Sequence, residues 1–289
     1  MTSQIHDLGY RAYTGERQGV GWAVRSLVVH TIRRSLGLKR SARHKLAPMA
    51  TIAIAYLPAL FMTALAIFLG GEIANDLVGY GDYFGLSGLA LFLFAAAVSP
   101  GVITTDRTNG MLALYLASPL TRTTYVLARA LGIWIVMLIV CVGPILFLIL
   151  GYTFAGAGPD GVLGFFEVIG QAVFIGALTA AAYTGLGMFV SSIPRRWAIA
   201  SVSIVAFFLI TSIVPAGLVD GSAVNRWILL AAPSQVLSEA AERVFDDPVF
   251  DFVGLDSLPG GPLIAMSVAY AIAGLVITWW RYQVLAVER

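Results

Sequence analysis

The feature that most constrains the fold of this chain is a set of six long runs without a charged residue. They cover residues 46–71, 83–105, 130–159, 168–194, 197–219 and 257–280. Each run reaches the roughly 20 residues that an α-helix needs to cross about 30 Å of hydrocarbon. Because 58% of the 289 residues are hydrophobic and only 12% are charged, a soluble domain of this size could not bury so much apolar surface. The sequence therefore predicts an all-α integral membrane protein with six transmembrane helices, at about 46–70, 84–105, 125–150, 168–191, 197–219 and 260–281.

The basic residues predict how these helices are oriented, because Lys and Arg near membrane spans stay on the cytoplasmic side. If the N-terminus is cytoplasmic, 16 of the 18 basic residues fall on that side, and the other side keeps only Arg226 and Arg243. We therefore expect both termini in the cytoplasm, a cytoplasmic N-terminal segment over 1–45 and a six-helix transmembrane domain over 46–289. Membrane lipids are expected partners of the basic segment, since anionic inner-leaflet lipids attract such charge. No nucleic-acid partner is needed to explain it.

Within the N-terminal segment, residues 20–36 have the pattern of an amphipathic helix. Its apolar face holds Val20, Val24, Leu27 and Val28, and its polar face holds Arg25, Ser26, His30 and Arg33. We expect an interfacial (elbow) helix with its apolar face in lipid and its arginines at the headgroups. Packing of this helix on a partner protein is the alternative.

Two further patterns concern helix packing. The last outer loop, residues 220–261, carries apolar stretches on both sides of Pro233, which predicts short extracytoplasmic helices before the last span, with Ser234 as a possible cap. In the fourth run, Ala177, Ala181 and Gly185 recur every four residues. Small residues at this spacing let helices approach closely, either within one chain or across a dimer.

Catalytic and metal-binding patterns are missing from the sequence. The histidines, His6, His30 and His44, do not stand at metal-ligand spacing, and the single cysteine, Cys141, lies inside an apolar run. There is no phosphate loop, nucleophile elbow or zinc-protease motif. We therefore expect no catalytic residues, no metal site and no cofactor in this chain, and we predict that it is not an enzyme. The uncharged deep parts of the runs also count against an ion-coupled transporter, although hydroxyls and carbonyls can hold Na⁺.

One short stretch between the second and third runs, residues 104–126, mixes charge, turn residues and apolar side chains. Residues 110–117 form an apolar helical pattern that is too short to cross a membrane. Thr105, Asp106 or Thr108 are possible caps for it, and Thr121 is a possible cap for the helix that follows. Such a helix at the cytoplasmic surface is suited to a groove on a partner protein, or it lies in the membrane interface.

This stretch, "DRTNGMLALYLASPLTRTTYVLARAL", resembles the signature between the second and third spans of ABC type-2 exporter permeases. The matching positions are Asp106, Gly110, Leu112, Leu114, Leu116, Ser118, Pro119, Leu120, Arg122, Tyr125, Val126, Leu127 and Arg129. The basic segment before the first span, the six spans, the inside termini and the long last outer loop are also similar to that family. The resemblance covers nearly the whole chain.

The resemblance implies a permease subunit of an ATP-driven exporter in the bacterial cytoplasmic (inner) membrane. It implies a second permease chain, in a homo- or heterodimer, and separate ABC ATPase subunits that carry ATP and Mg. Residues 105–123 would couple to these ATPases. The coupling residues implied are Asp106, Arg107, Asn109, Gly110, Met111, Leu112, Leu114, Tyr115, Ser118, Pro119 and Arg122, with Arg195 and Arg196 as a second cytoplasmic contact.

In this family the translocation pathway tends to be lined by the second and fifth spans. The corresponding residues here are Phe92, Phe94, Ser203, Phe207, Phe208 and Thr211. An aromatic, charge-poor route favours a hydrophobic or amphiphilic cargo; alternatively, these side chains face lipid or neighbouring helices. Other functions left open are a scaffold or subunit of a non-ABC membrane complex, and an ion-coupled secondary transporter or channel.

Overall fold

The computed structural model describes residues 19–38, 42–69, 79–221, 225–246 and 258–284. These residues form α-helices and one 3₁₀ helix, and no strand occurs among them. The elements are α1 (Val20–Ser35), α2 (Ala42–Leu69), α4 (Asp82–Thr108), α5 (Met111–Leu116), α6 (Arg122–Phe154), α7 (Gly161–Ser191), α8 (Trp197–Gly221), η1 (Arg226–Ala231), α9 (Pro233–Phe245) and α10 (Gly260–Val284).

Six of these helices, α2, α4, α6, α7, α8 and α10, are long and apolar enough to cross a membrane. This confirms the predicted all-α membrane fold with six spans. Helices α6 and α7 begin earlier than the expected starts near residues 125 and 168, at Arg122 and Gly161. Local backbone hydrogen bonding continues a helix through polar residues such as Glu167, so the apolar runs mark the membrane-crossing part and not the helix ends.

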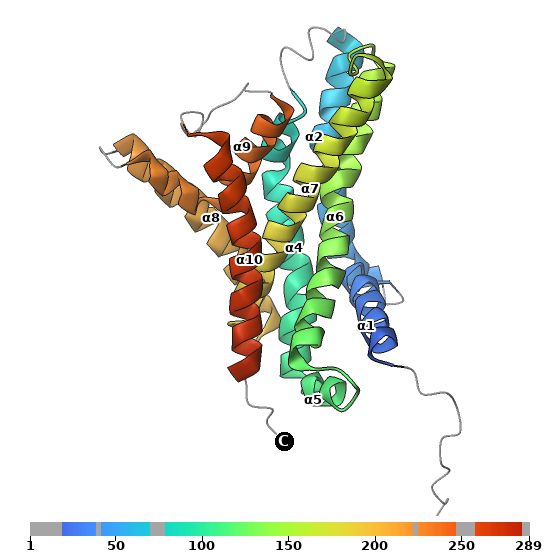
Figure 1. Cartoon of the computed structure of the whole chain (residues 1–289), viewed down its shortest axis with the longest axis vertical. Coiled ribbons are helices and arrows are strands. Elements are labelled where there is room, and N and C mark those ends of the chain that lie inside the picture. The colour runs from blue at the N-terminus through green and yellow to red at the C-terminus, as the bar shows by residue number, and fades with distance from the viewer. Residues whose placement is uncertain (1–18, 39–41, 70–78, 222–224, 247–257, 285–289) are drawn as a thin grey trace, which may run out of the picture.

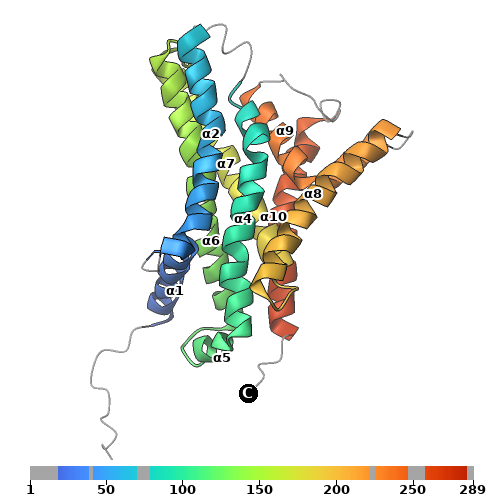
Figure 2. The ribbon, with the colours of Figure 1, turned by 180° about the vertical axis from the view of Figure 1, so that it is seen from behind.

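Helix α4 lies at the centre of the bundle (Figures 1 and 2), packed against α2, α6, α7 and α8, and it is the most enclosed of the six spans. Helix α8 leans away from the bundle toward its C-terminal end (Figures 1 and 2), and it contacts η1 and α9 along its length. Helix α5 lies at the opposite end, where it joins α4 to α6 (Figure 1). This arrangement places the end of the most buried span directly beside α5.

Close backbone contacts hold α7 against α10. A Cβ atom added at Gly274 would lie 2.2 Å from the carbonyl carbon of Gly185, and one added at Gly185 would lie 2.5 Å from the carbonyl oxygen of Ala271. Only glycine allows this approach, which brings backbone atoms into van der Waals contact over a long stretch. For Gly185, the small-residue pattern therefore serves packing within the chain.

The structure corrects two expectations about the shorter helices. Part of the predicted apolar face of α1 packs on the bundle and not in lipid: Leu27 and Val28 are buried and α1 lies along α6, whereas Val20 is exposed. Ser234 does not cap α9, because Pro233 is already the first helical residue and the N-cap is Ala232. The predicted broken helices before the last span are confirmed as η1 and α9, and Asn225 caps η1 by accepting from Trp227 N.

Candidate functional site

The turn from α4 into α5 depends on one glycine. Gly110 is the N-cap of α5 and has a φ of 65°, in the left-handed region that favours glycine. Its conformation ends α4 at Thr108 and starts α5 at once. The predicted caps at Thr105, Asp106 and Thr108 are therefore wrong, because these three residues belong to the last turn of α4.

The turn from α5 into α6 follows the prediction. Thr121 is the N-cap of α6, and Thr121 and Thr124 form a capping box in which each side chain binds the other residue's backbone N–H. Leu120 is buried just before it, while Ser118 and Pro119 are exposed. The segment is thus bounded by the Gly110 turn at one end and by the Thr121–Thr124 capping box at the other.

Helix α5 has one side against the bundle and one side in the open. Leu112 is buried, and Tyr115 is half-buried next to Arg129. Leu114 is 65% exposed, and Ala113 and Ala117 beside it are exposed as well. The short helix therefore presents a leucine and two alanines outward on a fixed support.

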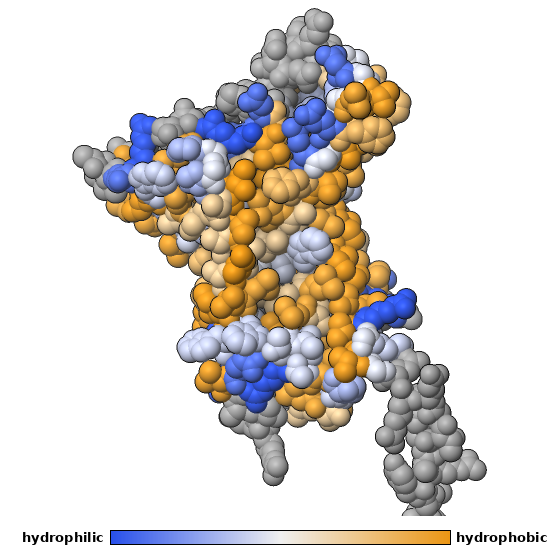
Figure 3. Space-filling model, in the orientation of Figure 1, coloured by the Kyte–Doolittle hydropathy of each residue, from blue (hydrophilic) through white to orange (hydrophobic). Residues whose placement is uncertain are grey.

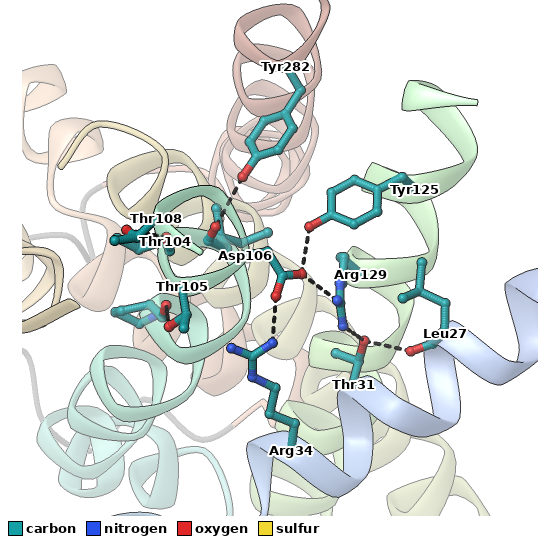
Figure 4. Close-up of polar contacts among 12 residues, drawn as sticks. Leu27, Thr31, Arg34, Thr104, Thr105, Asp106, Thr108, Tyr125, Arg129 and Tyr282 are labelled. Carbon is teal, nitrogen blue, oxygen red and sulfur yellow. Dashed lines mark hydrogen bonds and ion pairs between the residues drawn. The ribbon is translucent and has the colours of Figure 1, made fainter. Parts of the chain in front are cut away.

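That support contains a buried cluster of ionised groups (Figure 4). Asp106, with 1% of its side chain exposed, accepts from Arg34 Nη1 at 2.5 Å and also forms an ion pair with Arg129, which is fully buried. The hydroxyl of Tyr125 donates to the same carboxylate at 2.8 Å. Arg129 also donates to Thr31 Oγ1 at 2.8 Å. One carboxylate thus joins three helices, α1, α4 and α6.

Aromatic rings extend this cluster to α5. The guanidinium carbon of Arg129 lies 5.0 Å from the centre of the Tyr115 ring and 5.4 Å from that of Tyr125. A cation over an aromatic face is attracted by the ring quadrupole, most strongly where water is excluded. Tyr125 also stacks on Tyr282 of α10. Arg129 of α6 therefore contacts α5 through Tyr115, α4 through Asp106 and α1 through Thr31.

Sequence reasoning included Asp106 and Arg129 among the positions of the signature but missed their partners Arg34 and Thr31. The sequence separation between Arg34 and Asp106 is 72 residues. The only sequence signal for such a pair is a charge at the end of an apolar run, which needs a counter-charge once it is buried.

A second set of contacts joins the end of α4 to the turn between α7 and α8. Thr104 Oγ1 donates to the carbonyl of Ser191 at 2.8 Å, Arg107 Nη1 to that of Ser192 at 2.6 Å, and Thr108 Oγ1 to that of Arg195 at 2.6 Å. Thr104 and Arg107 satisfy carbonyls at the C-terminal end of α7, which have no partner inside the helix, and Thr108 binds the turn that follows. Arg195 and Arg196 themselves are exposed at this turn.

The other predicted coupling residues are divided between surface and support. Asn109 and Gly110 are exposed, and Met111 is half-buried. Arg122 is half-buried, where its guanidinium donates to the carbonyls of Tyr282 and Gln283 at the end of α10. The predicted second contact, Arg195 and Arg196, lies on the same end of the bundle because the α7–α8 turn is tied to α4.

The six candidate pathway residues fall into two groups. Phe94 and Phe208 are fully buried, and Phe92 stacks on Phe208 with ring centres 5.8 Å apart, so these three pack between α4 and its neighbours. Ser203, Phe207 and Thr211 of α8 are half-buried.

Within the described parts of the chain, no three His, Cys, Asp or Glu side chains are placed to hold a metal ion.

Together, these features define an all-α multi-pass membrane protein with a short apolar helix supported at one end. The family described as ABC-2 family transporter protein matches residues 42–280, which contain α5, the first five spans and α10 as far as residue 280. The chain belongs to this family and is a membrane permease, a transport subunit of an ABC transporter. Permeases of this family generally work with ATPase subunits. No curated protein matches the sequence.

Proposed function

We propose that this protein is the permease of an ATP-driven exporter, that α5 is its coupling helix, and that the ATPase subunits bind at α5. Each transporter would contain two permease chains and two ATPase subunits, and the ATPase subunits would carry the ATP and Mg. The observation that carries the proposal is the exposed side of α5, with Leu114 at its centre, on a support that reaches α1 and the two membrane helices α4 and α6. An apolar helix fixed in this way suits a groove on a partner.

The proposed orientation places α5, the α7–α8 turn and both termini in the cytoplasm of a bacterial cell, with the protein in the inner membrane. It is supported by the distribution of basic residues, 16 of 18 on that side. ATPase subunits act in the cytoplasm, so α5 and the exposed Arg195 and Arg196 would face them.

The residues of this end divide into two roles. Leu114, with Ala113 and Ala117, would touch the ATPase. Asp106 and Arg129 would hold α5 in place without touching the ATPase. When the ATPases close on ATP, they must favour one arrangement of the permease over another. A force on α5 would pass through Arg129 and Asp106 into α1, α4 and α6.

The cargo is proposed to be hydrophobic or amphiphilic, because the second and fifth spans carry few polar groups and no charge in their deep parts. Of the pathway candidates, the half-buried Ser203, Phe207 and Thr211 of α8 are the better placed, since Phe92, Phe94 and Phe208 pack inside the single chain. A scaffold or an ion-coupled transporter would not need an ATPase at α5.

The test is to replace Leu114 by Glu and to measure co-purification with the ABC ATPase encoded beside it. We expect loss of association and of ATP-dependent transport in vesicles, because a charge on α5 would be buried unpaired in the partner's groove. The matched control is Leu38→Glu at the turn after α1, where a leucine is 44% exposed and lies outside α5. Undiminished association and transport in the Leu114→Glu variant would overturn the proposal.

A further inference from the structure

Helix α1 has two different faces. Its inner face is buried against the bundle and holds Leu27, Val28, Thr31 and Ser35. Its outer face is a stripe spaced as on one side of a helix, and these side chains border a shallow hollow. The outer stripe consists of Trp22, Arg25, Ser26, Val29, His30 and Arg33.

The outer stripe carries two arginines that have no ion-pair partner among the described residues. Arg25 and Arg33 are exposed, and neither forms an ion pair within the described part of the chain. Helix α1 itself contains no acidic residue. The neighbouring Arg34 differs, because it points inward and pairs with Asp106.

The stripe lies at the edge of the apolar surface of the bundle. Gly132 of α6 touches Thr31 on the inner face of α1. At the same level, α6 exposes Leu127 and Leu131, as expected for a surface in contact with lipid tails. In Figure 3 the hydrophilic atoms over α1 adjoin the hydrophobic surface of the spans. Trp22, 59% exposed, is the residue type that prefers this depth of a membrane.

We propose that the outer stripe of α1 is a binding site for the headgroup of an anionic phospholipid in the adjacent leaflet. Arg25 and Arg33 would bind the lipid phosphate and any further negative group, because guanidinium groups match phosphate with paired hydrogen bonds. Trp22 and Val29 would contact the upper part of the acyl chains. Ser26 adds a hydroxyl to the lining of the hollow.

A lipid fits these observations better than a protein partner. The stripe combines Arg25 and Arg33, which form no ion pair with any described residue, with a tryptophan at the boundary of an apolar surface. A phospholipid presents negative charge and hydrocarbon at the same levels. The opposite face of the same helix contacts the Asp106 cluster through Thr31 and Arg34. If α5 is the coupling helix, as proposed above, a bound lipid would hold one wall of the support behind it.

The binding test uses the permease alone, so it does not depend on the proposed ATPase coupling. The protein is reconstituted in phosphatidylcholine vesicles with a minor fraction of brominated phosphatidylglycerol or, in parallel, brominated phosphatidylcholine. The signal of Trp22 is the part of the fluorescence quenching that disappears in Trp22→Phe. We expect phosphatidylglycerol to be enriched about five-fold or more at Trp22, since each basic residue near a membrane surface contributes about that factor.

The charge dependence supplies the controls. Arg25→Gln with Arg33→Gln should reduce the quenching by phosphatidylglycerol to the level of phosphatidylcholine, and the double Lys variant should retain the preference. Arg226→Gln removes an exposed arginine at the other end of the bundle and should change nothing. Equal quenching of Trp22 by both lipids would overturn the proposal. So would a preference that survives the double Gln change.

Discussion

Replacing Asp106 by Asn should strongly destabilise the protein, because it removes the only carboxylate of the buried cluster while keeping the size of the side chain. Arg129 would then be a buried cation with no counter-ion, and Arg34 would remain beside it. Removing one partner of a buried ion pair costs about 3–5 kcal/mol. Since Asp106 serves two arginines, we expect the upper part of that range. Arg34→Met should cost much less, because Asp106 keeps Arg129 and Tyr125.

The measurement is the free energy of unfolding of the purified permease in mixed micelles of a mild detergent and SDS, followed by circular dichroism. A double-mutant cycle of Asp106→Asn and Arg129→Met isolates the interaction between these residues. We expect the double variant to lose about 2–3 kcal/mol less than the sum of the single variants, since the uncompensated charge is gone. A loss below about 1 kcal/mol for Asp106→Asn, or strict additivity, would refute the assignment of the cluster as a buried, mutually dependent unit.

Two further predictions concern packing and the α7–α8 turn. Gly274→Ala should lower the free energy of unfolding by about 1–3 kcal/mol, because its Cβ would lie 2.2 Å from the carbonyl carbon of Gly185. The control is Gly170→Ala, whose Cβ would have no atom within 4 Å. Equal thermal stability of the two variants would contradict the packing argument. Arg107→Met should speed trypsin cleavage after Arg195 and Arg196 about ten-fold, since a hydrogen bond to a charged group contributes about 1.5 kcal/mol. An unchanged cleavage rate, with Arg25→Gln as the reference, would show that the 2.6 Å bond to Ser192 does not hold the turn.

The sequence by itself determined the helices. A backbone in hydrocarbon must satisfy its own hydrogen bonds, and this requirement acts on each apolar run separately, so six runs sufficed to predict six membrane helices. The same holds for local features: Thr121 caps α6 through neighbouring residues, and the short apolar pattern after Gly110 forms α5. The caps predicted for α5 and α9 were wrong because several residues near each helix start could act as the N-cap. The backbone conformation places Gly110 and Ala232 at these positions instead.

Only the tertiary structure decided which side chains meet at the end of the bundle. Asp106 reads in the sequence as a residue of a charged surface loop, yet it is buried between Arg34 and Arg129. Its partners lie 72 and 23 residues away, on helices whose relative rotation no local pattern specifies. The inner face of α1 was likewise settled by α6, where Gly132 leaves room for Thr31. Charge and apolarity along the chain state what must be compensated, whereas the packing of helices decides which residue compensates it.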